Sequence, residues 1–153
     1  MGADISVNRK ALHDYHIFER FEAGLELKGT EVKSIRAGKV NLNSAFARIE
    51  KGEAWIYDID IQPYEKASHE QHVPKRVRRL LLHRQEIDKL FGGTQIAGRS
   101  IVALRLFWKG SRVKVELGVG KGKDHRDQRA DIKKRETNRE MKRETADFNK
   151  RHR

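Results

Sequence analysis

The chain has 153 residues, of which 37% are hydrophobic, so it can bury one modest core and is expected to form one globular unit. Lys and Arg number 34 against 22 Asp and Glu, and the resulting formal charge of +12 favours a polyanionic partner, nucleic acid first and an anionic membrane second. The absence of cysteine excludes a disulfide framework and a Cys-ligated zinc, and no stretch approaches a signal peptide or the ~18 apolar residues of a membrane span, so we expect a cytoplasmic protein.

Alternation of apolar and polar residues predicts several β-strands. In residues 15–29 the apolar side chains at odd-numbered positions are predicted to form a buried face, and Glu22 falls on the outer face. The apolar side chains are Tyr15, Ile17, Phe21, Ala23, Leu25 and Leu27. Strands with the same alternation are predicted at residues 46–50, 55–61 and 113–119, and in the second of these Trp55 and Tyr57 share the buried face with Ile59 and Ile61. Residues 101–108 are nearly continuously apolar and predict a central strand.

Two turns join these strands. Lys51 and Gly52 follow the strand at 46–50, and residues 109–112 connect the central strand to the strand at 113–119. The second connection predicts a β-hairpin.

The stretch GTEVKSIR, residues 29–36, predicts a short helix between strands. Thr30 is a suitable N-cap, Glu31 favours the positive helix start, and Gly38 can end the helix. Val32 and Ile35 then face the core. The basic residues three apart share the outward side: Lys33, Arg36 and Lys39.

A second helix is predicted in RQEIDKLFGG, where Ile87, Leu90 and Phe91 fall on one side and Gly92-Gly93 supplies the end. Many short strands with helices over the ends indicate a mainly β protein with short α-helices. We therefore predict a small OB-like β-barrel, a common scaffold for nucleic-acid binding.

Half of the excess positive charge lies in a C-terminal tail. Residues 121–153 hold thirteen Lys and Arg against seven Asp and Glu, and their few apolar residues form no continuous stripe. The sequence therefore predicts a barrel domain at residues 1–120 and a basic C-terminal tail at 121–153. We expect the tail to be disordered alone and helical when bound to an anionic partner.

No pattern indicates catalysis or a metal site. The serines stand in no nucleophile motif, and no histidine has an orienting partner by spacing. His69 and His72 are three apart but lie in a predicted loop without further ligands. GVGKGK lacks the Ser or Thr that follows the lysine of a phosphate-binding loop, so we predict no enzyme, no metal and no cofactor.

Basic residues gather in three segments that could form one phosphate-binding surface. They are Arg9 and Lys10; Lys33, Arg36 and Lys39; and Lys75, Arg76, Arg78 and Arg79. Planar side chains at His13 and Tyr15 favour RNA, because such groups stack on unpaired bases. Tyr15 shares the parity of the buried face, which leaves core packing as its alternative role.

Four stretches of the chain resemble small protein B, the SsrA-binding protein family of bacteria. They are NRKALHDYHIFERFEAGLELKGTEVKSIRAGKVNL, RRLLLHRQEIDKLFG, IVALRLFWKGSRVKVELGVGKGK and DQRADIKKRE, and they occur in the family's order over nearly the whole chain.

The resemblance implies an OB-like barrel that binds the tRNA-like domain of tmRNA (SsrA RNA) and delivers it to stalled 70S ribosomes in trans-translation. It implies a non-enzymatic protein whose tail enters the empty mRNA channel and folds as a helix near the decoding centre. Elongation factor Tu and alanyl-tRNA synthetase become indirect partners, because they act on the same tmRNA. We expect a monomer, since no further apolar stripe remains.

Family members contact or shape the RNA-binding face at positions that correspond to Asn8, His13, Tyr15 and Glu22, and Leu81 lies in the family's RRLLL segment. For Leu81 we expect core packing. Tail residues implied to contact the ribosome are Lys121, Lys123, His125, Arg126, Asp127, Arg129, Ile132, Lys133, Lys134 and Arg135. Asp124 and Gln128 replace lysines that the family commonly has, and either Arg126 or His125 fills the family's planar position.

Two alternatives remain open from the residues. One is a general basic RNA binder without preference for tmRNA, and it predicts similar affinity for many RNAs with a common salt dependence. The other is an RNA-processing nuclease, which needs clustered carboxylates or paired histidines that the spacing does not supply.

Overall fold

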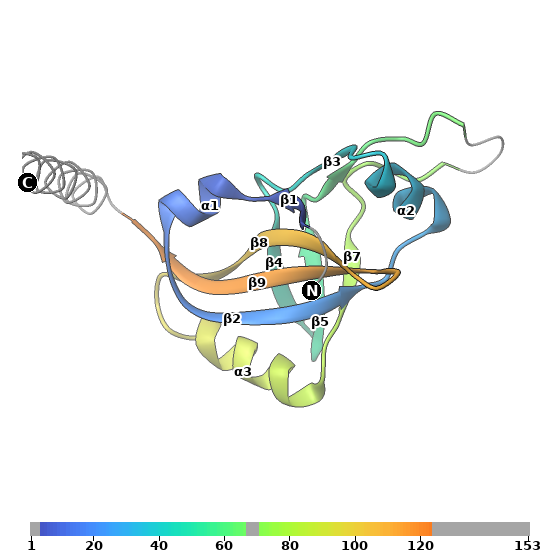
Figure 1. The fold of residues 1–153 in the computed structure, drawn as a ribbon. Coiled ribbons are helices and arrows are strands. Elements are labelled where there is room, and N and C mark those ends of the chain that lie inside the picture. The colour runs from blue at the N-terminus through green and yellow to red at the C-terminus, as the bar shows by residue number, and fades with distance from the viewer. Residues whose placement is uncertain (1–3, 67–70, 124–153) are drawn as a thin grey trace, which may run out of the picture. The chain divides into compact units, whose positions relative to one another are not determined.

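The computed structural model describes residues 4–66 and 71–123 (Figure 1). The elements in chain order are β1 (Asp4–Val7), α1 (Arg9–Asp14), β2 (Tyr15–Leu25), α2 (Gly29–Arg36), β3 (Val40–Asn41), β4 (Phe46–Glu50), β5 (Glu53–Tyr57), β6 (Asp60–Ile61), β7 (Arg78–Leu81), α3 (Arg84–Thr94), β8 (Arg99–Lys109) and β9 (Arg112–Gly122). The predicted fold class, mainly β with short helices, is confirmed.

The sheet curves into a barrel-like ring. Its strand order is β1-β8-β4-β5-β7-β2-β9, and β8 also pairs with β9. The long antiparallel ladders β2–β9 and β8–β9 form one strongly joined side, whereas β2–β7, β5–β7 and β4–β8 are each joined by only two residue pairs. The ring is therefore less regular than a closed barrel. Figure 1 shows α3 on one side of the curved sheet and α1 and α2 on the other.

Both predicted hairpin turns are present. Lys51 and Gly52 have φ of 50° and 76° between β4 and β5, the left-handed conformation that a tight two-residue hairpin needs. Gly110, with φ of 62°, lies in the turn between β8 and β9. The predicted helix end at Gly38 is also confirmed, because Gly38 has φ of 74° and its N–H donates to the Ile35 carbonyl at 2.9 Å.

The core lies inside the ring and under the helices. Ile35 of α2 and Leu90 of α3 are almost completely buried with the inward side chains of the strands. The largest of those inward side chains are Ile56, Leu80, Ile101, Leu106 and Leu117. A second, smaller cluster joins Ala11 of α1 to Val102 and Leu104 of β8, so α1 is anchored on the central strand.

The predicted register of residues 55–61 is wrong. Ala54 and Ile56 face the core, while Trp55 and Tyr57 lie half-buried on the outer face. Asp58 has φ of 62° and interrupts the strand, after which Ile59 is fully buried. An aspartate tolerates this left-handed conformation, so one residue resets the alternation.

The predicted helices also differ in detail. The N-cap of α2 is Lys28 rather than Thr30, because the Glu31 carboxylate accepts the Lys28 N–H. Helix α3 continues through Gly92-Gly93 to Thr94, and Phe91 is half exposed rather than buried. Helix α1 was not predicted; it has only six residues and follows no long apolar pattern.

Gly120 of β9 lies close against the backbone of β2. A Cβ at Gly120 would lie 2.6 Å from the His16 carbonyl oxygen, whereas a Cβ at Gly122 in the same strand would meet nothing within 4 Å. We expect Gly120→Ala to lower the free energy of unfolding by about 1–3 kcal/mol or more, because backbone must move. We expect Gly122→Ala to change it by less than about 0.5 kcal/mol. Urea unfolding of both variants measures the difference, and equal effects would contradict it.

Candidate nucleic-acid interface

Asn8 holds α1 in place from a buried position. Its Oδ1 accepts the Ala11 N–H at 3.0 Å, and its Nδ2 donates to the carbonyls of Leu42 and Ala103 at 3.0 and 2.8 Å. Only 1% of Asn8 is exposed. Its hydrogen-bonding groups are used inside the protein, which favours the second of the two expected roles, shaping the RNA-binding face rather than contacting RNA. Asn8 can still shape the face that α1 presents.

Exposed basic residues follow on α1. Arg9, Lys10 and His13 are exposed, and His13 Nδ1 lies 2.9 Å from Asp14 Oδ1. Tyr15 begins β2 and is half-buried. The basic side chains of α1 therefore face solvent, and Tyr15 borders them as a partly accessible residue.

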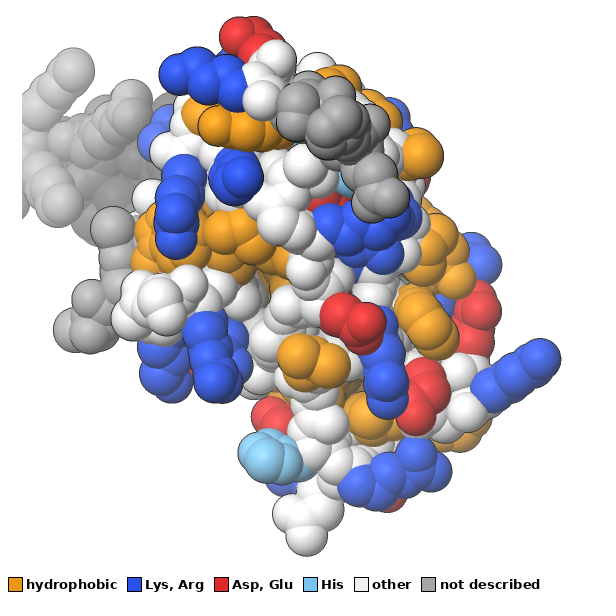
Figure 2. Space-filling model, turned by 90° about the vertical axis from the view of Figure 1, so that its right-hand side faces the viewer, with side chains coloured by type: hydrophobic (Ala, Val, Ile, Leu, Met, Phe, Trp, Pro, Cys, Tyr) orange, Lys and Arg blue, Asp and Glu red, His pale blue; other side chains and the backbone are white. Residues whose placement is uncertain are grey.

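Helix α2 presents two cations as the sequence predicted. Lys33 and Arg36 are exposed, while Ile35 packs into the core. The Lys33 ammonium lies 5.4 Å from the centroid of the Tyr64 ring, and the Arg36 guanidinium lies 6.0 Å from that of Trp108. Each aromatic ring restrains a cation while leaving it on the surface. Figure 2 faces this side of the molecule and shows Lys and Arg side chains spread over it, interspersed with acidic and hydrophobic ones.

Glu31 joins α2 to the basic segment before β7. The carboxylate is fully buried, accepts from Arg76 Nη2 at 2.6 Å and also accepts from Arg78 Nε. Arg78 additionally donates to the carbonyls of Ile59 and Pro74 at 2.7 and 3.0 Å. Two of the three predicted basic segments are thus brought together by one buried anion.

Arg78 is fully buried, so the prediction that it binds RNA is wrong. Its guanidinium can be buried because the carboxylate of Glu31, 47 residues earlier, is buried beside it and balances its charge. Arg76 is partly exposed, with 28% of its side chain accessible, and Lys75 is exposed. Arg79 is exposed and pairs with Glu53 at 3.0 Å. Lys75 and the outer edge of Arg76 remain available to a ligand.

Glu22 lies on the outer face of β2, as predicted, and accepts from Lys109 Nζ at 3.0 Å. Leu81 on the neighbouring β7 is 52% exposed, so the expected core packing of Leu81 is wrong. Both residues line one surface hollow of about 530 Å³ together with Lys109 and Lys114. Sequence reasoning missed these two lysines, although Lys114 has the outward parity in its strand.

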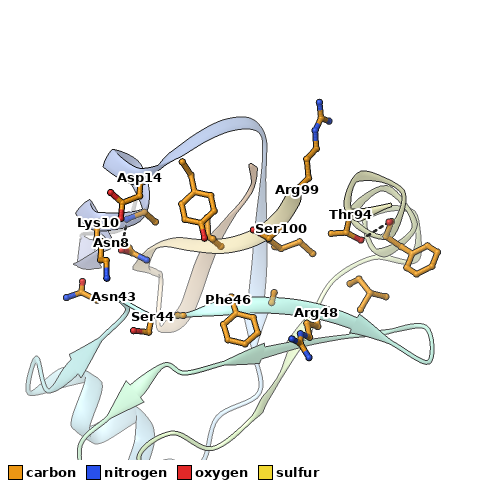
Figure 3. Close-up of a pocket in the computed structure, with 18 of the residues that line it drawn as sticks. Asn8, Lys10, Asp14, Asn43, Ser44, Phe46, Arg48, Thr94, Arg99 and Ser100 are labelled. Atoms are coloured by element: carbon orange, nitrogen blue, oxygen red, sulfur yellow. Dashed lines mark hydrogen bonds between the residues drawn. The ribbon is translucent and has the colours of Figure 1, made fainter. Parts of the chain in front are cut away.

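A larger groove of about 580 Å³ lies between α1, β4, the start of β8 and the end of α3 (Figure 3). Lys10 and Tyr15 line it, as do Phe46 and Arg48 of β4, which sequence reasoning also missed. The predicted residues therefore fall into three groups: one on α1, one joining α2 to residues 75–76, and Glu22 in the hollow on β2.

Most of the predicted tail contacts fall outside the described residues. Lys121 lies in β9 and is exposed, with His16 of β2 and Arg99 of β8 as its register partners, and its contact with the ribosome stays a prediction. Lys123 is half-buried just after the strand. The remaining tail residues, His125, Arg126, Asp127, Arg129, Ile132, Lys133, Lys134 and Arg135, lie outside the described residues. The domain boundary after residue 120 stays a prediction.

Of the two loop histidines, His72 lies in the described part of the chain and has a structural role. His72 is buried, with Nδ1 2.9 Å from Thr30 Oγ1 and Nε2 2.9 Å from the Ile61 carbonyl. His69 lies outside the described residues. Among residues 4–66 and 71–123, no three His, Asp or Glu side chains form a metal-binding group, and no helix is long and apolar enough to cross a membrane.

A barrel-like sheet with cationic helices over its rim defines a small basic β protein of a class suited to binding RNA. Residues 5–147 match the family described as SmpB protein. The chain belongs to the SmpB family.

The relatives cover nearly the whole chain. The SsrA-binding protein of Carboxydothermus hydrogenoformans is 54% identical over 137 residues, which are 90% of this chain and 92% of that protein. The SsrA-binding protein of Bacillus pumilus is 50% identical over 149 residues, 97% of this chain and 96% of that protein. A solved structure described as "tmRNA-SmpB: a journey to the center of the bacterial ribosome" contains a chain 42% identical to this one. Its TM-score is 0.68, and the match covers 85% of this chain and 95% of that chain.

The pKa of Glu31 follows from its partners. Burial raises this pKa, but hydrogen bonds from Arg76, the Lys28 N–H and Arg78 outweigh the burial, and the pKa lies below its ordinary value of 4.5. The carboxylate is therefore ionised throughout the neutral range. The negative charge that joins α2 to residues 76–78 is permanent under those conditions.

Removing this charge is expected to be costly. Glu31→Gln leaves the buried Arg78 guanidinium without its counter-charge, and we expect the free energy of unfolding to fall by about 3–5 kcal/mol. Glu65→Gln is the matched control, because Glu65 pairs with Lys39 at 2.6 Å but 79% of its side chain is exposed. Its expected effect is small, because solvent screens an exposed ion pair. Equal losses in urea unfolding would contradict the proposed role of burial.

The contribution of Glu31 also depends on pH. Because its pKa is lower in the folded than in the unfolded state, its stabilising effect is complete above about pH 4.5 and is lost as the pH falls further. The difference in free energy of unfolding between the wild type and Glu31→Gln should be constant from pH 7 down to about 5.5 and shrink below about 4.5. A difference that grows on acidification would oppose this assignment.

Proposed function

We propose that the chain binds the tRNA-like domain of tmRNA (SsrA RNA) and delivers it to stalled ribosomes in trans-translation. One observation supports this above the others: relatives at least 50% identical over most of their length are SsrA-binding proteins. The similar chain in the tmRNA-SmpB structure adds the ribosome as a partner. The alternative of a general basic RNA binder has no comparable support.

The exposed cations give the proposal a physical basis. Arg9, Lys10, Lys33, Arg36 and Lys75 are exposed, and together they can neutralise phosphates along an RNA backbone. His13 and Tyr15 are placed to stack or to hydrogen-bond beside them. Arg76 binds at its exposed edge while it secures Glu31.

Glu22 and Leu81 suit a different kind of contact. A carboxylate repels phosphate but accepts hydrogen bonds from base or sugar groups, and the neighbouring Lys109 and Lys114 offset its charge. The exposed Leu81 supplies an apolar surface next to it. We propose that this hollow discriminates among RNAs, while the helices supply affinity.

For the tail we propose entry into the empty mRNA channel, with helix formation near the decoding centre. Its contacts would come from residues 121–135, with Arg126 or His125 stacking on a ribosomal base. The protein would act as a monomer in the bacterial cytoplasm and would bind without catalysing a reaction. Elongation factor Tu and alanyl-tRNA synthetase would meet it through tmRNA.

A titration compares two RNAs and two proteins. The full chain and a version ending at Lys123, which retains all of β9, are titrated with a tmRNA tRNA-like domain and with an intact tRNA at two salt concentrations. We expect both proteins to prefer the tRNA-like domain, because the described cations and the hollow remain in the shorter one.

Tail removal deletes four of the twelve excess positive charges, a third of the total, so a general polyanion binder should lose substantial affinity. Equal affinity for the two RNAs, falling in parallel with salt, would overturn the proposal. A preference that survives both higher salt and truncation would support it, and would direct attention to the tail on the ribosome.

A further inference from the structure

The outer face of β4 and β5 presents aromatic side chains in register. Phe46 pairs with Tyr57 across the two strands, and Arg48 pairs with Trp55. The rings of Phe46 and Tyr57 are stacked, with centroids 5.2 Å apart and planes inclined by 9°. Cross-strand partners share one face, so all four side chains project from the same side of the sheet.

Arg48 lies over this stack. Its guanidinium carbon is 5.4 Å from the centroid of the Phe46 ring and 5.8 Å from that of the Tyr57 ring. Arg48 is exposed, while the aromatic residues are half-buried. A guanidinium is planar, so an exposed one beside aromatic rings offers a surface on which a nucleobase can stack.

The groove beside α1 begins at this platform. Phe46 and Arg48 line it along β4, and Lys10, Asn43 and Ser44 line its other end (Figure 3). Arg99 also borders the groove but points away from it in Figure 3, with its guanidinium 4.1 Å from the Phe18 ring centroid. The volume of about 580 Å³ is large enough for a nucleotide.

The charge in the groove favours an anionic occupant. Lys10 and Arg48 are cationic, and the one carboxylate in the lining, Asp14, is already engaged by His13. The chain's own residues 121–153 have a net positive charge and are therefore poor occupants. Asn43 and Ser44 add amide and hydroxyl groups that can bond to a base or a ribose.

We propose that this groove binds a single-stranded RNA segment, with an unpaired base stacked on the platform of Phe46, Arg48 and Tyr57 and a phosphate near Lys10. This second site uses β4 and β5, whereas the hollow with Glu22 lies on β2 and β7. The inference rests on the proposed function for the choice of RNA as partner. It adds a site for unpaired bases that recognition of a folded tRNA-like domain does not require.

Trp55 is a built-in reporter, because it is the cross-strand neighbour of Arg48. The chain has two tryptophans, so Trp108→Phe in the full-length protein leaves Trp55 as the only one. This protein is titrated with octauridylate, with an eight-base-pair RNA duplex and with hexaglutamate, while Trp55 fluorescence is followed. The tRNA-like domain is titrated in parallel.

Two variants with the same chemical change separate stacking from charge. Arg48→Lys keeps the charge of the platform and removes its plane, and Arg112→Lys makes the same change at an exposed site in the β8–β9 hairpin. We expect octauridylate to quench Trp55, and we expect Arg48→Lys to weaken its binding about five-fold or more while Arg112→Lys leaves it unchanged. Thermal unfolding checks that both variants remain folded.

Three results would overturn the inference: no quenching by octauridylate, equal effects of the two variants, or equal binding of the duplex or hexaglutamate. If the tRNA-like domain still binds in those cases, the second site alone is refuted. If octauridylate binds as expected but the tRNA-like domain shows no preference over tRNA, the proposed function fails and the stacking site stands.

Discussion

The buried ion pair between Glu31 and Arg78 determines where the exposed cations of α2 and of residues 75–76 lie. Helix α2 and the start of β7 are far apart in sequence, and a fully buried carboxylate holds them together. Such a pair is expensive to desolvate, and its geometry must therefore be satisfied almost completely. The carbonyls of Ile59 and Pro74 complete the hydrogen bonds of Arg78, so one network also fixes the irregular chain between β5 and β7.

The exposed cations derive their positions from this and from one further buried polar group. Asn8 fixes α1 against β8, just as Glu31 fixes α2 against the segment before β7. Lys33 and Arg36 are in turn restrained by aromatic rings. The surface is therefore built on rigid supports, which lowers the conformational entropy lost when it meets an RNA. Asn8 and Glu31 are buried and thus do not face the RNA, yet they determine where the exposed cations lie.

The sequence pattern correctly predicted the strands and turns that are determined by neighbouring residues. Alternation identified β4, and the turn chemistry of Lys51-Gly52 and Gly110 identified the hairpins. Local pattern cannot identify partners that are distant in sequence. Nothing near Arg78 indicates that it is buried, because the carboxylate that pairs with it, Glu31, lies 47 residues away. Asp58 shows the same limit for strand register, since a single residue in a left-handed conformation reverses which side chains face the core.

The way β9 ends has a mechanical consequence. This strand is paired along nearly its whole length with β2 on one side and β8 on the other, up to Gly122. Tension applied to the chain beyond it would pull along the strand axis and load two ladders of hydrogen bonds in shear at once. Bonds loaded together yield only at higher force than bonds peeled one by one. A pull on the C-terminal segment would thus be resisted by both ladders of β9.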